Sequence, residues 1–529
     1  MLRRRLLYPI VVVLLLGQMA FAMVTTAVQQ SPTIDEPVYV GTAAVYAQQH
    51  SLRYNPEHPP LAKLFMAAGM AFEDAKLDAG YQGNQSLLGR HLLYESGNNP
   101  FRLMLAARLP IIVLTLLFGL VVLFFARDLA GPWAGLVALA LYSFSPDLIA
   151  HGALATLDVP AAGLVLTTFW LLWRAREKPR LYLPLAGVAL GAALATRAST
   201  LPAVPIALLL ALLPLRTGWR TGWRTGGKKI LTAAGVGVIA VATVWLIYLA
   251  VDPRLRFTTP AGITNPGGLR GLAVDLLPFP KAYRDGVLMQ FKFERQTFNG
   301  FLFGEAYKGS LWYYLPAALL IKTPLGMIAL WVAGTVTLLV KKWIAALYTL
   351  LPAGVLMLVA MTGARDYGSR YVIFMPMFLA VVAGTVVLIR WKWTWIPTAV
   401  LVAFVAVSSL RTFPYYLPYS NEAFGGTANT HNNLHDSNVD WGQDLPRLAA
   451  ALREKYAGEK VWLVYKGSGV PSYYGIDAPN PLGVPLDQVH GIVVVSDSRV
   501  ALARNQLKRL IDSSTVIDQV GYSMTVYRR

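Results

Sequence analysis

The sequence contains no cysteine and few charged residues, and both shortages restrict what the protein can be. Without cysteine the chain has no disulfide and no thiolate metal site, although this says little about its compartment. Charged residues make up 14% of the 529 residues and hydrophobic residues 55%, and the mean hydropathy is +0.47. Soluble proteins of this length are more polar, so the composition predicts a polytopic membrane protein.

Acidic residues are also scarce, since 28 Asp and Glu stand against 47 Lys and Arg, a net charge of +19. An excess of this sign suits nucleic-acid binding when it forms one basic face. Here the basic residues form short clusters between apolar runs. They therefore indicate membrane topology, and we expect no nucleic-acid partner.

Apolar runs long enough to cross a bilayer as helices follow one another along the chain. We predict eleven, at about 6–24, 103–125, 133–148, 157–173, 181–195, 201–215, 230–251, 312–340, 343–361, 371–389 and 395–410. The first run also resembles a signal peptide, with "AFA" as its small-residue cleavage site. Cleavage there would leave the topology of the other runs unchanged.

Every second loop between these runs is basic. The basic loops hold residues 3–5, Arg127, the stretch "RAREKPR", residues 216–229, Lys341 with Lys342, and Arg390 with Lys392. We therefore predict a multi-pass protein of the inner, cytoplasmic membrane. By the positive-inside rule its N-terminus is cytoplasmic and its C-terminus is extracytoplasmic. The repeat "RTGWRTGWRTGG" at 216–227 is interpreted as an interfacial anchor that contacts membrane lipids; nucleotide binding is the alternative, without P-loop spacing.

Three outer segments are long enough to fold: two loops at 25–102 and 252–311, and the tail at 411–529. In the tail the β-rich runs "KVWLVYK", "GIVVVSDS" and "SMTVYRR" alternate with helical stretches. This alternation predicts a small extracytoplasmic α/β domain at 411–529, beside a helical membrane domain at 1–410.

Adjacent carboxylates, Asp35 and Glu36, follow the first apolar run, and Glu57 lies in "NPEHPPLAK" of the same outer loop. Carboxylates beside a bilayer need water, a partner or a substrate, so these are functional candidates. Taken alone, the pattern equally suits a helix start, with Asp35 or Thr33 as the cap of "EPVYVGTAAVYAQQ".

Six motifs together resemble the membrane glycosyltransferases of the protein O-mannosyltransferase and aminoarabinose transferase superfamily, glycosyltransferase family 39-like. They are "DEPVY", "EHPPLAK", "HGALATLDVPAAG", "GSLWYYLPAALLIKTPLG", "ARDYGSRYV" and "DSNVDWGQDL", which occur in family order between residues 33 and 445. The closest similarity is to bacterial phospholipid carrier-dependent glycosyltransferases. The resemblance implies a C-type glycosyltransferase (GT-C) fold of about eleven transmembrane helices with the active site on the outer face.

The resemblance also implies that Asp35 is the general base that takes the proton from an acceptor hydroxyl. Glu36 and Glu57 would orient acceptor and donor. Inverting transfer needs one carboxylate opposite the leaving group, and a phosphate leaving group needs no acid. The remaining substrate-contacting candidates in the motifs and at the outer ends of the helices are His58, Lys63, His151, Asp158, Arg197, Lys322, Arg365, Arg370, Tyr371 and Trp441.

The cations among them are expected to bind the donor phosphate. Lys322 lies well inside an apolar run and should meet an anion or a carboxylate. Snorkelling to the lipid headgroups is the alternative for Arg197, Lys322 and Arg370. His58 replaces a lysine that is common in aminoarabinose transferases, which weakens donor contact there. The loop 252–311 is too short for a β-trefoil insert, so a protein acceptor is not implied.

A divalent metal held by His151, Asp158, Glu57 and His58 is possible, but we do not favour one because a monophosphate donor needs none; His151 would instead order the site by hydrogen bonding. In "DSNVDWGQDL", Asp436, Asp440 and Asp444 are spaced as one face of a helix, but Gly442 and the Asn and Ser residues before it predict a loop followed by a helix. Trp441 would stack on a sugar or pack against the membrane domain.

The resulting prediction is an inverting glycosyltransferase that moves a sugar from a polyprenyl-phosphate donor to a hydroxyl of a lipid, glycan or protein acceptor, outside the cytoplasmic membrane and without a cofactor. The alternative is a transporter or flippase for a lipid-linked saccharide, although such folds usually have two related halves and this sequence has no such symmetry. A non-catalytic assembly factor is the third hypothesis.

Overall fold

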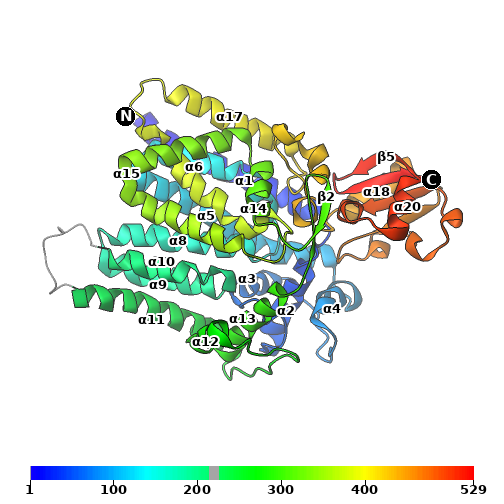
Figure 1. The fold of residues 1–529 in the computed structure, drawn as a ribbon, viewed down its shortest axis with the longest axis horizontal. Helices are drawn as coiled ribbons and strands as arrows, with labels where there is room; N and C mark the ends of the chain where they lie inside the picture. Colours follow the sequence, from blue (N-terminus) through cyan, green and yellow to red (C-terminus); the bar gives the residue numbers. More distant parts are fainter. Residues whose placement is uncertain (1, 214–225) are drawn as a thin grey trace.

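Long helices lie side by side in the computed structural model, which describes residues 2–213 and 226–529. Figure 1 shows the C-terminal sheet at one end of this helical layer and the N-terminus at the other. The helices of the layer are α1 (Leu2–Gln29), α5 (Pro100–Ala130), α6 (Pro132–Ser143), α7 (Pro146–Gly152), α8 (Asp158–Ala175), α9 (Pro179–Leu194), α10 (Ala203–Leu212), α11 (Gly226–Val251), α14 (Tyr314–Lys322), α15 (Leu325–Ala360), α16 (Phe374–Ala383) and α17 (Trp395–Thr412). Residues 216–225 of the repeat at 216–227, and the end of the run 201–215, lie outside the described residues.

Five helices in the described ranges are long and apolar enough to cross a membrane, or six if α6 and α7, bent by 64°, form one span. The five spans are Leu7–Gln29, Pro100–Ala130, Lys229–Val251, Leu325–Ala360 and Trp395–Thr412. Each predicted apolar run coincides with helical segments of this layer. A polytopic helical protein is therefore confirmed, while the number eleven stays a prediction.

Several predicted runs are interrupted, and each interruption has a local cause. The run 312–340 breaks at Thr323, which is extended (φ −100°, ψ 129°) because Pro324 disfavours helical geometry in the residue before it. The run 133–148 breaks before Pro146 in the same way. Lys342, at the predicted loop between two runs, is non-helical (φ −148°, ψ 52°) and divides α15 into two helices.

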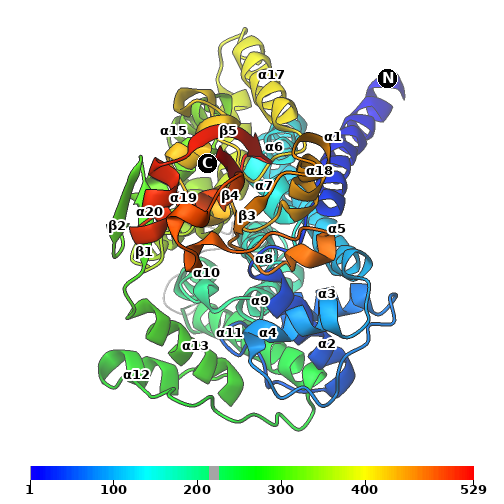
Figure 2. The ribbon, with the colours of Figure 1, turned by 90° about the vertical axis from the view of Figure 1, so that its right-hand side faces the viewer.

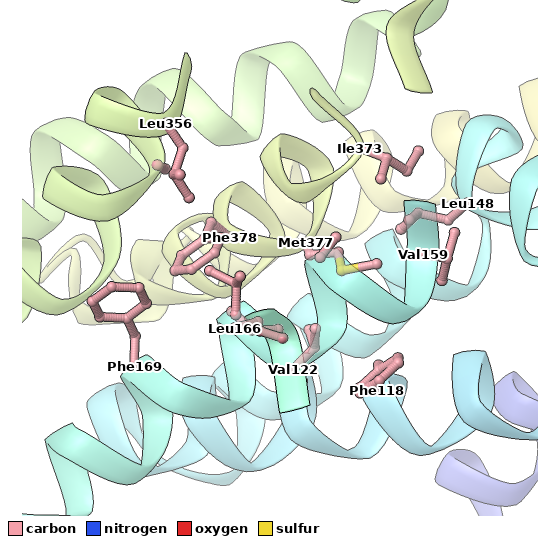
Figure 3. Packing of buried hydrophobic residues seen from close by; sticks show 14 of the residues in the cluster. Phe118, Val122, Leu148, Val159, Leu166, Phe169, Leu356, Ile373, Met377 and Phe378 are labelled. Carbon is pink, nitrogen blue, oxygen red and sulfur yellow. The ribbon is translucent and has the colours of Figure 1, made fainter. Parts of the chain in front are cut away.

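The core of the layer is formed by α5, α8, α15 and α16 (Figure 3). Phe169 of α8 and Phe378 of α16 pack edge to face, with ring centroids 6.0 Å apart. Gly163, the last residue of "HGALATLDVPAAG", allows α8 to approach α5, because a Cβ atom there would lie 2.2 Å from the Phe118 ring. The end of this motif is thus explained by helix packing.

Three of the predicted basic loops meet at one end of the layer. Arg174 of α8 pairs with Asp128 of α5 at 3.0 Å, and Lys342 Nζ donates to the Leu129 carbonyl at 2.5 Å. These contacts place the loops on one side, as the charge pattern predicts. The side of the membrane that this end faces stays a prediction.

The opposite end carries the outer segments and the tail. The first segment folds into α2 (Glu36–Gln49), α3 (Leu61–Met70), α4 (Gln85–Arg90) and a single π-helical turn, His91–Glu95. The second forms α12 (Gly268–Asp275), α13 (Lys281–Glu294) and the antiparallel hairpin of β1 (Asn299–Leu302) and β2 (Glu305–Lys308). Figure 2, which looks at this end, shows both groups beside the tail domain.

The tail is an α/β domain, as its alternating pattern predicts. Its sheet has the order β3-β4-β6-β5, with β3 parallel to β4 and the other pairs antiparallel. The elements are α18 (Leu445–Lys455), β3 (Val461–Val464), β4 (Ile492–Ser496), α19 (Asp497–Ala501), α20 (Asn505–Asp512), β5 (Thr515–Val520) and β6 (Met524–Arg528). The strand β5 was not predicted, and the domain boundary at 410 stays a prediction.

His435 of the tail packs against two other parts of the chain: the strand β1, which holds Phe301, and the loop between α15 and α16, which holds Tyr367. Its ring packs against the Phe301 ring at 6.1 Å and the Tyr367 ring at 6.0 Å, and neither ring nitrogen has a hydrogen-bond partner among the described residues. Burial lowers the pKa of His435 to about 4; Asp436 raises this pKa and Lys466 lowers it further.

Acid should therefore weaken this contact. Between pH 6.5 and 4 the unfolded chain takes up a proton that native His435 does not, so stability falls as pH falls, by about 3 kcal/mol at pH 4. We expect His435→Phe to flatten the decline of the thermal midpoint over this window. His490→Phe, which removes an exposed tail histidine, should leave the decline unchanged. An equal decline in His435→Phe would contradict the assignment.

Candidate active site

Asp35 stands immediately before α2, at the position where a helix cap is expected. Its side chain makes no capping hydrogen bond, and its Oδ2 accepts from Arg370 NH1 at 2.6 Å instead. The side chain is 29% exposed, so solvent or a substrate can reach it. The structure thus favours the functional interpretation of Asp35 over the capping one.

Glu36, the next residue, is fully buried and has a different environment. Its two oxygens accept from Arg108 Nε and NH2, both at 2.7 Å, and from the backbone N–H groups of Thr33 at 2.8 Å and Ala155 at 2.7 Å. Burial alone would raise the pKa of Glu36, but Arg108 and these donors hold it below its usual value. Direct contact of Glu36 with a substrate has no geometric support here, because its acceptor positions are occupied.

Arg108 fixes the backbone that precedes Asp35. Besides Glu36, it donates to the carbonyls of Ala27 at 2.6 Å, Gln30 at 3.1 Å and Ser31 at 3.1 Å. All four of these residues are buried. The Glu36–Arg108 pair therefore anchors the link between α1 and α2.

Two arginines and a second carboxylate surround Asp35. Asp158, at the start of α8, accepts a short hydrogen bond from Arg197 NH1, and its other oxygen lies 4.0 Å from Arg370 NH1. The ring of Tyr371 lies below both guanidinium groups, at 5.6 Å from Arg197 and 5.1 Å from Arg370. The group holds two carboxylates and two arginines, drawn from four distant parts of the chain.

His58 lies beside this group. Its ring meets the Tyr39 ring edge to face at 5.7 Å. Burial lowers the pKa of His58 well below its usual value, and Arg197, Lys63, Arg365 and Arg370 add to this effect. The imidazole is therefore neutral at pH 7 and offers one donor and one acceptor.

The turn at 55–63 is held by hydrogen bonds of its own side chains. Buried Lys63 Nζ donates to the carbonyl of His58 at 2.7 Å and to both oxygens of Asn55, at 3.0 and 3.1 Å. Glu57 Oε1 accepts from Gln85 at 2.8 Å, whereas its buried Oε2 has no partner in the described part of the chain. Lys63 therefore organises the turn, and Glu57 keeps a free acceptor.

Arg365 reaches the same turn through α13. Its NH2 donates to Gln290 Oε1 at 3.0 Å, and it pairs with Glu294 at 3.3 Å. Gln290 in turn donates from Nε2 to the Glu57 carbonyl at 3.2 Å. The second outer loop is thus part of the site.

Lys322 pairs with the carboxylate of Asp147, as its place inside an apolar run predicts. Its Nζ lies 3.3 Å from Asp147 Oδ1 and donates to the carbonyls of Leu417 at 2.5 Å and Asn438 at 3.0 Å. Both side chains are buried. Lys322 therefore joins α14, α7 and the tail, and phosphate contact has no geometric support.

His151 and Trp441 are buried beneath Arg370. Trp441 is 1% exposed, its indole lies 4.2 Å from the Arg370 guanidinium, and its ring meets His151 edge to face at 6.0 Å. Trp441 thus packs against the membrane domain and has no face open to a sugar. Neither nitrogen of His151 has a hydrogen-bond partner among the described residues, so the predicted ordering by hydrogen bonds is not observed.

The predicted residues therefore divide by access. The partly exposed ones are Asp35, His58, Arg197, Arg365 and Tyr371. The buried ones are Glu36, Glu57, Lys63, His151, Asp158, Lys322, Arg370 and Trp441. Their roles in substrate contact stay predictions. In the described ranges no three His, Asp or Glu side chains gather at one point in a geometry suited to a metal ion.

An apolar hollow of about 590 Å³ lies at the start of α13. Its lining includes Leu52, Trp245, Phe279, Lys281 and Arg284. Arg284 Nε is buried without a hydrogen-bond partner in the described ranges. Gln290 lies nine residues after Lys281, the first residue of α13, which is about 14 Å along the helix at 1.5 Å per residue.

Three contributors were missed from the sequence: Arg108, Asp147 and Tyr39. Arg108 had a signal, because it is a charged residue inside the apolar run 103–125. Asp147, next to the helix-breaking Pro146, had a weaker one of the same kind. Tyr39 is the last residue of the motif "DEPVY", but it was passed over because an aromatic residue on an apolar helix is ordinarily core.

Together, the helical layer and the tail domain have the architecture of the C-type glycosyltransferase (GT-C) fold. Residues 101–248 match the family model described as dolichyl-phosphate-mannose-protein mannosyltransferase. The structure is similar to ArnT from Cupriavidus metallidurans in the apo state, with a TM-score of 0.51 and 14% identity, over 98% of this chain and 97% of that one. At this identity the likeness shows the fold, and the predicted fold class is confirmed.

Two further structures align with lower scores. ArnT from C. metallidurans bound to undecaprenyl phosphate gives a TM-score of 0.46 at 14% identity, over 98% and 97% of the two chains. The Archaeoglobus fulgidus oligosaccharyltransferase in the apo form gives 0.45 at 13% identity, over 89% of this chain and 60% of that one. No curated protein matches the chain by sequence.

Proposed function

We propose that the protein transfers a sugar from a polyprenyl-phosphate donor to an acceptor hydroxyl, with inversion, at the outer face of the cytoplasmic membrane. The observation that carries this proposal is the contact between Asp35 Oδ2 and Arg370 NH1, at 2.6 Å. It joins a partly exposed carboxylate, suited to proton abstraction, to a cation suited to a phosphate. Each directly follows a residue that hydrogen-bonds to the tail: Ile34 N–H donates to the Trp441 carbonyl, and Ser369 N–H donates to Asn438 Oδ1.

In the proposed reaction the acceptor oxygen attacks the anomeric carbon from the face opposite the phosphate. Asp35 takes the hydroxyl proton, the bond from the anomeric carbon to the phosphate oxygen breaks, and polyprenyl phosphate leaves with the electron pair. Arg370 and Arg197 stabilise the charge on the leaving phosphate. Tyr371, below both guanidinium groups, keeps them in place.

The donor would also free the base. The Arg370 guanidinium is paired with the Asp35 carboxylate, and this contact occupies the Oδ2 atom that could take the acceptor proton. A donor phosphate competes for Arg370 and releases Asp35 to the acceptor hydroxyl. Donor binding would therefore precede productive acceptor binding.

A polyprenyl carrier fits the relatives and the hollow at α13. ArnT from C. metallidurans was crystallised with undecaprenyl phosphate, and the matched family model names a dolichyl-phosphate donor. Both are long isoprenoid phosphates. The hollow offers apolar walls for such a chain, while Arg370 and Arg197 would bind its single phosphate.

The reaction is proposed to need no metal. The leaving group is a monophosphate, and Arg197 and Arg370 supply the positive charge that a metal would otherwise provide. Asp158, one of the candidate ligands, already accepts from Arg197. Chelation with EDTA should leave the transfer rate unchanged, and a lost rate that Mg²⁺ or Mn²⁺ restores would refute this part.

The deciding test uses purified protein and radiolabelled polyprenyl-phosphate sugars, with a mixture of envelope lipids and glycans as acceptors. We expect release of free polyprenyl phosphate together with label on an acceptor. An equal amount of Asp35→Asn protein is the control and should release none. A transporter or an assembly factor would release no polyprenyl phosphate from either protein, which would reject the proposal.

A further inference from the structure

The motif "DSNVDWGQDL" has no role in the proposed chemistry, yet part of it lies between the two segments that carry Asp35 and Arg370. We call residues 437–443 the clasp segment. It lies within the tail domain, shortly before α18, and is buried throughout. Its contacts with the two segments are made by different residues.

On the Asp35 side, the clasp segment binds residues 31–34 like a short strand. Ser31 N–H donates to the Gln443 carbonyl at 2.9 Å, Ser31 Oγ donates to the Gly442 carbonyl at 2.9 Å, and Ile34 N–H donates to the Trp441 carbonyl at 3.0 Å. Ile34 directly precedes Asp35. The backbone of the base is thus held from one side by Arg108 and from the other by the clasp segment.

On the Arg370 side, the clasp segment binds the turn at 367–369. Ser437 donates to the Tyr367 carbonyl from its N–H at 3.1 Å and from Oγ at 2.6 Å, and Ser369 N–H donates to Asn438 Oδ1 at 2.9 Å. The approach at Gly368 is close, since a Cβ atom there would lie 2.1 Å from Ser437 Oγ and 3.4 Å from Ser437 Cβ.

The clasp segment is itself fixed to the helical layer. The Asn438 carbonyl accepts from Lys322 Nζ at 3.0 Å, and Asn438 Nδ2 donates to Tyr314 OH at 3.0 Å. Asp147, the partner of Lys322, accepts from Ser369 Oγ at 2.7 Å. The Lys322–Asp147 pair is therefore linked, through Ser369, to the turn that carries Arg370.

We propose that the clasp segment is a positioning element of the active site, which sets the separation of Asp35 and Arg370 through Gly442, Ser437 and Asn438 while Trp441 supports the guanidinium. This proposal rests on the proposed function. The supporting observation is that one segment hydrogen-bonds both to the backbone before Asp35 and to the turn before Arg370. The tail domain would then be needed for catalysis without touching a substrate.

The contact between Gly368 and Ser437 offers a specific test. Gly368→Ala adds a methyl group that collides with Ser437 Oγ and pushes the turn away, and a misplacement of about 1 Å can cost about 10²-fold in rate. Ser437→Ala removes that oxygen, so the double variant Gly368→Ala/Ser437→Ala fits again, with Cβ atoms in ordinary contact. We expect kcat to fall about 10²-fold in Gly368→Ala, less than 5-fold in Ser437→Ala, and to recover in the double variant.

The matched control is Gly483→Ala, which adds the same methyl group in the tail domain where no atom lies within 4 Å. It should keep wild-type kcat. Wild-type kcat in Gly368→Ala, or a double variant no better than Gly368→Ala, would overturn the proposal. A structural role alone would lower the folded yield of Gly368→Ala without a change of kcat in the folded fraction.

A second measurement separates failure of this inference from failure of the proposed function. Because the chain lacks cysteine, spin labels can be placed through Val28→Cys and Thr362→Cys, two exposed positions that flank the two segments. In pulsed electron paramagnetic resonance we expect the distance distribution to shift or broaden in Gly368→Ala and to return in the double variant. An unchanged distribution overturns the clasp proposal even where transfer is observed, and a changed one supports it even where transfer is not.

Discussion

Asp35→Asn should abolish transfer while the protein stays folded. A positioned general base contributes about 10²- to 10⁴-fold to rate, and asparagine keeps the shape of the side chain without its basicity. The fold should tolerate the change, because Asp35 is partly exposed and Asp158 remains as an anion within 4.0 Å of Arg370. The measurement is the rate of polyprenyl-phosphate release by monodisperse protein.

Two variants decide whether the effect is specific to Asp35. Glu73→Gln neutralises another carboxylate of the same outer loop, which pairs with Arg102 at 3.0 Å, and should keep wild-type activity. Glu57→Gln removes the other candidate acceptor, the unpartnered Oε2, and should slow transfer far less than Asp35→Asn. If Glu57→Gln abolishes transfer and Asp35→Asn does not, Glu57 is the base and our assignment is wrong.

Arg108→Met should be the most destabilising single substitution in the site. It leaves the carboxylate of Glu36 buried with only neutral donors, and three backbone carbonyls lose their partner. Removal of one member of a buried ion pair typically costs about 3–5 kcal/mol. We expect a large fall in the thermal midpoint in detergent and in the yield of monodisperse protein.

The matched control is Arg102→Met, on the same helix two turns earlier. Arg102 is an exposed arginine that pairs with Glu73, and exposed pairs contribute about 0–1 kcal/mol. Its midpoint should stay close to that of the wild type. Equal midpoints for the two variants would show that the Glu36–Arg108 pair does not anchor the link between α1 and α2.

The helices of the fold could be predicted because each depends on local hydrophobicity. The breaks at Pro146 and Pro324 were predictable too, since the residue before a proline avoids helical geometry, but a count of apolar residues does not register them. The strand β5, "TVIDQV", escaped notice because its outer residues are exposed and its pattern is weak. Packing against β6, which no local pattern encodes, makes it a strand.

The candidate site was predictable in its composition but not in its pairing. The sequence pointed to Asp35 and to Arg370, yet their contact joins residues 335 positions apart, and a single sequence carries no information on such distances. For the same reason it left Asp35 undecided between a cap and a base. Lys322 shows the opposite case, because burial of a lysine in an apolar helix demands an anion, and Asp147 supplies it.

The buried pair of Glu36 and Arg108 has a consequence for substrate choice. Because Glu36 is immobilised directly beside Asp35, the base can move only by rotation of its own short side chain. In the proposed reaction an acceptor must therefore carry its hydroxyl to a fixed position, whereas the isoprenoid chain would lie along the hollow at α13, some helical turns away. We expect strict discrimination among acceptor alcohols, down to stereoisomers at one carbon, together with broad tolerance of carriers that differ in the number of isoprene units.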